Sequence, residues 1–381
     1  MDLIPLDYAT LRIIWWLLLG VLLLGFAIMD GFDLGVATLL PFVAHSAEER
    51  GVVVNTIGPV WEGNQVWLIL GGGAIFAAFP PLYAVSFSGF YLAMFVILFA
   101  LILRPVGFKF RGKVDPKWQS TWDWALFIGG AVPALIFGVA VGNVLLGVPF
   151  HFTPELRPVY TGGFFGLLTP FALLAGLVSV AILVAHGAAM LVMKTEGAIA
   201  ERSARYGSAA ALVAALLYVL GGVWLALGVT GYRVDSAIDG AMASNPLRKQ
   251  VSTGAGLWME NFAQMPWIWL LPLLGIAGTL ACAFFLRGRR GGAAFVSSAV
   301  SLTGIIIGVG FTTFPFLLPS SSVPAAGLTL WDASSSHMTL WVMLIATVIF
   351  LPLVLLYTAW VFRVLRGKVT PESVKNTPNA Y

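Results

Sequence analysis

The chain alternates between long apolar runs and short polar segments. A helix needs about 20 mostly apolar residues to cross the hydrocarbon core of a bilayer. Nine runs reach or approach that length, at residues 11–33, 64–80, 85–104, 122–147, 163–193, 207–229, 267–287, 294–318 and 338–362. The pattern predicts an all-α fold, a polytopic membrane helical bundle with nine transmembrane helices.

The second run is the weakest of the nine. Its sequence, GNQVWLILGGGAIFAAFP, is short and rich in glycine and ends at Pro80 and Pro81. Glycine in a membrane helix allows a neighbouring helix to pack closely, so we retain this run as a span. We expect one transmembrane domain over residues 1–381, ending in a flexible cytoplasmic tail at 367–381, because Pro, Asn and Ser are typical of disorder.

Composition places the chain in the membrane class. It is 59% hydrophobic and only 10% charged, with a mean hydropathy of +0.92, whereas soluble domains carry roughly 25% charged residues. The sequence contains no GxxxxGK[ST], GxGxxG or HExxH motif, so nucleotide-driven and zinc chemistry have no support. We assign no catalytic residue and no metal ligand to this chain.

The basic side chains are distributed unevenly between the two sides of the predicted membrane. Lys and Arg favour the cytoplasmic side. Of the 21 Lys and Arg residues, only Arg12, Arg157, Arg233, Arg248 and Lys249 fall on the side of the N-terminus. This asymmetry predicts a periplasmic N-terminus and a cytoplasmic C-terminus. It also explains the net charge of +4 by orientation in the bilayer, without nucleic-acid binding.

Four charged residues fall at the predicted cytoplasmic level of the first three spans. Asp30 and Asp33 lie three residues apart and therefore share one face of a helix, Glu62 opens the second span, and Arg104 ends the third. Charged groups inside a membrane are costly and are usually paired or functional. The residues alone leave two interpretations open: a structural ion-pair network and an entry site for protons.

The segment WEGNQVW adds two amides to this level. Asn64 and Gln65 follow Glu62 between two tryptophans. They could serve a helix N-terminus, where polar side chains satisfy backbone donors. They could equally form a polar contact between subunits or along a proton route. Both interpretations stay open from the residues alone.

Histidine and cysteine offer little for a cofactor. Of the four histidines, only His186 falls inside a predicted span, and the single cysteine, Cys282, lies in an apolar run. A haem pair within the membrane would require several axial His or Met ligands. We therefore expect His186 to be a hydrogen-bonded core residue and Cys282 a small buried hydrophobe. Cofactor-binding residues remain unknown at this stage.

Several longer motifs resemble one family. These motifs occur in order across nearly the whole chain. They are GFAIMDGFDLGV, WEGNQVWLI, FSGFY, RPVGFKFR, GVAVGN, FPF with PSS, LTLWDASSS and LLYTAW. They resemble subunit II of cytochrome bd quinol oxidase. The resemblance implies a bacterial inner-membrane complex of the respiratory chain. Such a terminal oxidase oxidises quinol and reduces oxygen to water, generating proton-motive force without pumping.

The resemblance also implies partners and cofactors. Haem b and haem d are expected in subunit I, which would form a heterodimer with this chain, and this subunit II would be free of haem. A small single-span subunit, membrane lipid and a structural quinone are further possible partners. The family role of subunit II is to stabilise subunit I and to contribute a cytoplasmic proton path. The sequence does not distinguish ubiquinol from menaquinol.

The family's proton-route positions can be carried over to this chain. They are occupied here by Asp30, Asp33, Glu62 and Arg104, with Asn64 and Gln65 as supporting polar contacts. Two positions depart from the family pattern. Glu62 stands where Asp is more common, and Val60 stands where some members have His, so a relay here would use water or another side chain.

Two other classes of protein are compatible with nine spans. A proton-coupled secondary transporter would carry polar residues near the bilayer midplane and broken helices there, whereas the charges of this chain lie at one edge. A purely structural scaffold would use the same charges only as ion pairs. In a scaffold, neutral isosteres would alter assembly and leave turnover per assembled complex unchanged.

Overall fold

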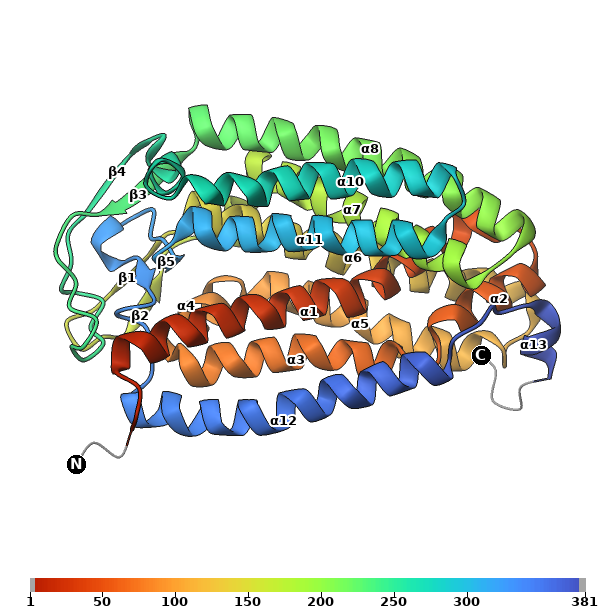
Figure 1. Cartoon of the computed structure of the whole chain (residues 1–381), viewed down its shortest axis with the longest axis horizontal. Helices are drawn as coiled ribbons and strands as arrows, with labels where there is room; N and C mark the ends of the chain where they lie inside the picture. Colours follow the sequence, from red (N-terminus) through yellow and green to blue (C-terminus); the bar gives the residue numbers. More distant parts are fainter. Residues whose placement is uncertain (1–3, 377–381) are drawn as a thin grey trace.

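The computed structural model describes residues 4–376 as a bundle of long helices that run along one common axis (Figure 1). The long helices are α1 (Tyr8–Val43), α3 (Trp61–Ala78), α5 (Tyr91–Arg111), α6 (Pro116–Leu146), α7 (Pro170–Lys194), α8 (Gly197–Gly228), α10 (Leu270–Arg287), α11 (Gly291–Thr313) and α12 (His337–Val364). The shorter ones are α2 (Ala47–Ile57), α4 (Pro80–Gly89), α9 (Glu260–Gln264) and α13 (Pro371–Lys375), with 3₁₀ turns η1 (Phe164–Leu167), η2 (Leu257–Met259), η3 (Pro266–Trp269) and η4 (Pro324–Ala326).

Within residues 4–376, eight helical segments are long and apolar enough to cross a membrane. They include every predicted span except the second, which corresponds to α3. Helix α3 has 18 residues, or about 27 Å at 1.5 Å per residue, and lies alongside α1 (Figure 1). The helical membrane class is therefore confirmed, while the count of nine spans and the orientation of the termini stay predictions.

Several helix boundaries differ from the predicted spans, among them the start of α8, which lies at Gly197 and not at 207. Helix α1 runs to Val43, ten residues beyond the predicted end at Asp33. The predicted third span, 85–104, is divided between α4 and α5, which meet at Phe90. Helix α7 begins at Pro170, because η1 precedes it, and not at 163. Proline suits the first helical turn, where its missing N–H costs nothing.

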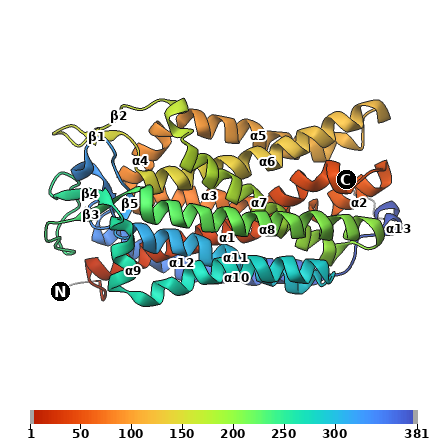
Figure 2. The same ribbon diagram turned by 90° about the horizontal axis from the view of Figure 1, so that it is seen from above.

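The two ends of the bundle are built differently (Figures 1 and 2). One end carries the start of α1 and three antiparallel two-stranded sheets, whereas α2 and α13 lie at the other. The sheets pair β1 (Phe150–Phe152) with β2 (Pro158–Tyr160), β3 (Thr230–Val234) with β4 (Val251–Ala255), and β5 (Phe316–Leu318) with β6 (Leu328–Thr329). We refer to these as the hairpin end and the α2 end.

Glycine allows α1 to touch two neighbouring helices backbone to backbone. A Cβ added to Gly35 would lie 2.0 Å from the carbonyl oxygen of Leu183 on α7, and Gly187 of α7 meets the backbone of Gly35 in return. On α6, a Cβ at Gly130 would lie 2.5 Å from the Leu34 carbonyl oxygen. These approaches fix the segment of α1 that carries the two aspartates.

A buried arginine closes the hairpin end. Arg12 of α1 is 0% exposed and donates to Ser334 Oγ at 2.7 Å, to the Gly240 carbonyl at 2.7 Å and to the Met242 carbonyl at 2.9 Å. Its guanidinium also lies 3.7 Å from the centre of the Tyr8 ring. Residues from the beginning, the middle and the end of the chain thus meet at one side chain.

Part of the predicted flexible tail has regular structure. Residues 371–375 form α13, whose Lys375 pairs with Glu48 of α2 at 2.7 Å. Just before it, the Val369 N–H donates to the Lys194 carbonyl at 2.7 Å. The rest of the tail, residues 377–381, lies outside the described residues.

Candidate functional site

Asp30 of α1 and Arg104 of α5 form a buried ion pair between the two helices. Arg104 donates from Nη2 to Asp30 Oδ1 at 2.7 Å and from Nη1 to Asp30 Oδ2 at 3.0 Å. Both side chains are 0% exposed. Charge-assisted pairs of this two-point geometry are among the stronger hydrogen bonds in proteins. The sequence prediction that Arg104 and Asp30 lie at one level therefore corresponds to a direct contact.

The second aspartate is held by an amide. Asp33 Oδ2 accepts from Asn64 Nδ2 at 2.9 Å and lies 3.8 Å from Arg104 Nη2. Asp33 is 0% exposed and Asn64 is 3% exposed. Within residues 4–376, Asp33 Oδ1 and Arg104 Nε are buried without a hydrogen-bond partner. We call Asp30, Asp33, Asn64 and Arg104 the aspartate cluster.

Helix α6 supplies the space for this cluster. A Cβ added to Gly129 would lie 2.9 Å from Arg104 Cγ and 3.0 Å from the Ala100 carbonyl oxygen. Any larger residue would therefore push against the stem of Arg104. The Arg104 guanidinium also lies 5.9 Å from the centre of the Trp61 ring, which is within the range of a cation–π contact.

Two predicted site residues lie outside the cluster. Glu62, in the first turn of α3, is exposed, and among residues 4–376 it has no hydrogen bond or ion pair. Gln65 is half-buried and also makes no such contact in this part of the chain. The structure thus brings together four of the six predicted residues and places the other two on the outer side of α3.

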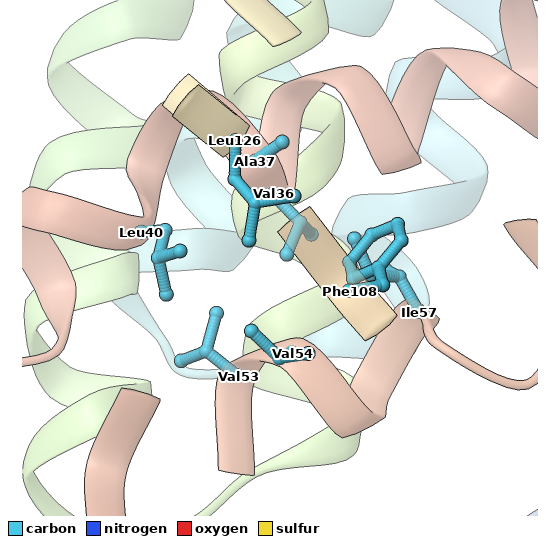
Figure 3. A pocket seen from close by; sticks show the side chains of 8 residues that line it. All are labelled: Val36, Ala37, Leu40, Val53, Val54, Ile57, Phe108 and Leu126. Atoms are coloured by element: carbon cyan, nitrogen blue, oxygen red, sulfur yellow. The ribbon is translucent and has the colours of Figure 1, made fainter. Parts of the chain in front are cut away.

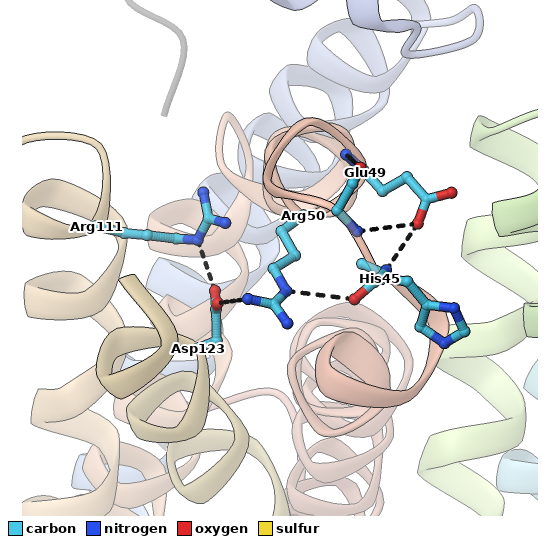
Figure 4. Close-up of polar contacts among 7 residues, drawn as sticks. His45, Glu49, Arg50, Arg111 and Asp123 are labelled. Atoms are coloured by element: carbon cyan, nitrogen blue, oxygen red, sulfur yellow. Dashed lines mark hydrogen bonds and ion pairs between the residues drawn. The ribbon is translucent and has the colours of Figure 1, made fainter. Parts of the chain in front are cut away.

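A second ionic cluster lies toward the α2 end (Figure 4). Asp123 of α6 accepts from Arg111 Nε of α5 at 2.6 Å and from Arg50 Nη1 of α2 at 2.9 Å. Asp123 and Arg111 are buried. The sequence analysis assigned no role to this trio, although Asp123, at the start of an apolar run, was a signal of the same kind as Asp30.

Glu49, next to Arg50 in the sequence, joins α2 to α8. It accepts hydrogen bonds from the His45 N–H at 2.7 Å and from Arg202 Nη2 at 2.5 Å. Burial alone would raise the pKa of Glu49, but these hydrogen bonds outweigh it and lower the pKa below its usual value. Glu49 is therefore a charged carboxylate at neutral pH.

A dry cavity lies among α1, α2, α5 and α6 (Figure 3). The space between its side chains amounts to about 170 Å³ and is too narrow to admit a water molecule. Its lining is wholly apolar and consists of Val36, Ala37, Leu40, Val53, Val54, Ile57, Phe108 and Leu126. No polar side chain lines this gap.

His186 occupies a hydrogen-bonded position in the core. Its Nε2 lies 2.9 Å from the Ile28 carbonyl oxygen and its Nδ1 lies 2.7 Å from Ser298 Oγ, while the ring stacks on Phe295. A carbonyl oxygen only accepts, so Nε2 carries the hydrogen. Both ring nitrogens are engaged, and in residues 4–376 no group of three His, Cys, Asp or Glu side chains could hold a metal ion.

The chain matches known proteins over its whole length. The family described as "Cytochrome bd terminal oxidase subunit II" matches residues 11–365. The "Cytochrome bd-I ubiquinol oxidase subunit 2" of Escherichia coli and the "Probable cytochrome oxidase subunit 2" of Haemophilus influenzae are each 48% identical, over 99% of this chain and 100% of theirs. The "Cytochrome bd ubiquinol oxidase subunit 2" of Bacillus subtilis is 32% identical over 95% of this chain and 98% of its own.

A solved structure shares the fold. A chain of the bd oxidase from Geobacillus thermodenitrificans superposes with a TM-score of 0.66 at 17% identity, covering 93% of this chain and 98% of that one. The similarity at this identity concerns the helical arrangement alone. With the family match and the full-length relatives, the chain belongs to the cytochrome bd terminal oxidase subunit II family.

Proposed function

We propose that this chain is the haem-free subunit II of a bacterial inner-membrane quinol oxidase that reduces oxygen to water, and that the aspartate cluster handles the protons which the reaction consumes. The observation that carries the proposal is that two fully buried carboxylates share one arginine. The names of the relatives support the oxidase, since they are subunit 2 of ubiquinol oxidases.

Charge balance assigns the proton within the cluster. Both oxygens of Asp30 accept from Arg104, so this pair is neutral as it stands. Asp33 adds a second carboxyl group, and its Oδ1 is the buried oxygen that lacks a partner in residues 4–376. An unpaired buried charge is costly, so a proton resides on Asp33. Loss of that proton leaves a net negative charge that draws in the next one.

The orientation of the bundle determines which side supplies the protons. In Figure 1, α1 runs from the hairpin end to the α2 end, α3 returns beside it, and α5 runs to the α2 end again. This course supports nine crossings. The uneven distribution of Lys and Arg then supports a periplasmic hairpin end and a cytoplasmic α2 end. Glu62, exposed at the start of α3, would collect protons from the cytoplasmic side.

The outer faces of α3 and α12 are the surfaces proposed for subunit I. Of the 28 residues of α12, Leu340 is the one that is buried. On α3, added Cβ atoms at Gly72 and Gly73 would meet nothing within 4 Å, and Glu62 is exposed at the start of the same helix. A carboxylate and bare glycine backbone suit a protein neighbour better than lipid. Haem b and haem d would belong to that partner, and no quinone site is assigned here.

The test is turnover per haem in the purified complex. We expect Asp33→Asn to lower oxygen consumption several-fold with an unchanged haem spectrum, and Glu62→Gln to lower it less, because Glu62 makes no contact with the cluster. Asp115→Asn is the matched control, since Asp115 is an exposed carboxylate paired with Lys117. Full turnover in Asp33→Asn with reduced assembly would favour the structural scaffold instead.

A further inference from the structure

The second ionic cluster has more positive than negative charge. Arg50 and Arg111 share the single carboxylate of Asp123, which leaves a net charge of about +1 at this point. The nearest acidic side chains of α2 are engaged elsewhere, because Glu49 pairs with Arg202 and Glu48 with Lys375. Within residues 4–376, no second carboxylate pairs with the two arginines.

Both guanidiniums also have donors to spare. Arg111 is 5% exposed, and its Nη2 is buried without a hydrogen-bond partner in the described part of the chain. Arg50 uses Nη1 for Asp123 and Nε for the Ala44 carbonyl, and 27% of its side chain is exposed. A buried guanidinium N–H without an acceptor is costly, and an anionic oxygen from outside the chain would approach the cluster on the exposed side of Arg50.

The depth of the cluster matches the headgroup layer of a membrane. Helix α5 has 21 residues, or about 31 Å at 1.5 Å per residue, which equals the thickness of the hydrocarbon core. Arg111 is its last residue. The exposed aromatic side chains Phe110, Trp118 and Trp124 lie around the same corner, as aromatic belts do at the interface between lipid and water.

We propose that Arg50 and Arg111 bind a phosphate oxyanion, and that its source is the headgroup of an anionic phospholipid. Guanidinium groups recognise phosphate oxygens through paired hydrogen bonds. Lipid has access to this corner because α5 packs mainly against α6, and its outer face carries exposed Phe95, Phe99 and Phe110. The bound headgroup would hold α2 to the α5–α6 hairpin through its contacts to both arginines.

Native mass spectrometry of the purified, delipidated complex tests the proposal. Phosphatidylglycerol would be added at increasing concentration, with phosphatidylcholine as the neutral lipid. We expect Arg111→Gln to weaken retention of phosphatidylglycerol about fivefold, the effect of one basic side chain near an anionic surface. Arg50→Gln should do the same with less effect on folding, since Arg50 is partly exposed. The haem spectrum reports whether each variant assembles.

Arg289→Gln is the matched control, because Arg289 is an exposed arginine at the same end, paired with exposed Glu201. Equal loss of phosphatidylglycerol in this control would overturn the site, since charge alone would then explain binding. Equal retention of both lipids by the unaltered complex would also overturn it. If inorganic phosphate binds and protects the cluster while phosphatidylglycerol does not, the lipid source is wrong and a free anion occupies the site.

Discussion

Removal of the arginine from the aspartate cluster should destabilise the protein strongly. In Arg104→Met, Asp30 loses two hydrogen bonds of 2.7 and 3.0 Å, and Asp33 loses a cation 3.8 Å away. Each hydrogen bond to a charged group is worth about 1.5–3 kcal/mol, and breaking a buried ion pair costs about 3–5 kcal/mol. All three side chains are completely buried, so we expect the upper part of that range to apply.

A second substitution separates the effect of the unpaired charge on stability from the effect of lost side-chain packing. In the double variant Arg104→Met with Asp30→Asn, neither buried charge of the pair remains, and Asp33 is neutral. Replacement of both partners of a buried pair is often nearly neutral. The double variant should therefore be more stable than Arg104→Met alone, with a coupling energy of about 1–3 kcal/mol between the two positions.

The assay is unfolding of the purified complex, followed by tryptophan fluorescence, for both single variants and the double variant. Arg289→Met removes an exposed ion pair and should change stability little. Strictly additive effects of the two substitutions would refute the reasoning, because the pair would then contribute nothing beyond its separate side chains. A loss in Arg104→Met no larger than in Arg289→Met would refute it as well.

Two further predictions concern packing and pH. Gly129→Ala should destabilise the protein by about 1–3 kcal/mol in the same unfolding assay, because the new Cβ would lie 2.9 Å from Arg104 Cγ, whereas Gly73→Ala, with nothing within 4 Å, should have little effect. Glu49→Gln should lower the thermal midpoint at pH 7, because a carboxylate whose pKa is lowered by the His45 N–H and by Arg202 stabilises the fold above its unfolded pKa of about 4.3. That difference from the unaltered protein should shrink as the pH falls below this value and through the lower pKa of the folded state, and a constant difference from pH 7 to 3 would contradict the assignment.

The sequence predicted which residues of the aspartate cluster lie at one level, but not which of them are in contact. The spacing of Asp30 and Asp33 predicted a shared face, and both point into the bundle. Glu62 and Asn64 were placed together because they are close in sequence. Two positions along a helix correspond to a rotation of about 200°, so Asn64 turns toward Asp33 while Glu62 turns outward. Only the neighbouring helices determine which of the two faces the core.

The end of the first span shows a similar limit. A run of apolar residues that reaches two aspartates predicts that the hydrophobic segment ends there. Helix α1 nevertheless continues to Val43, because Arg104, 74 positions away, neutralises Asp30. Arg111 and Asp123 were not paired either, because the predicted spans 85–104 and 122–147 left Arg111 in a loop and Asp123 inside a span. Long-range pairing of charges cannot be read from local hydropathy.

The contacts of Arg12 constrain the order in which this chain can mature during synthesis. Arg12 belongs to the first helix, but its acceptor at Gly240 is made 228 residues later and Ser334 322 residues later. At 5–20 residues per second, translation needs roughly 10–50 seconds to reach Gly240. Throughout that interval the arginine lacks these protein acceptors and must stay hydrated. The hydrogen bonds of Arg12 at the hairpin end can therefore form only after most of the chain has left the ribosome. This end is completed only in a chain whose synthesis has passed Ser334.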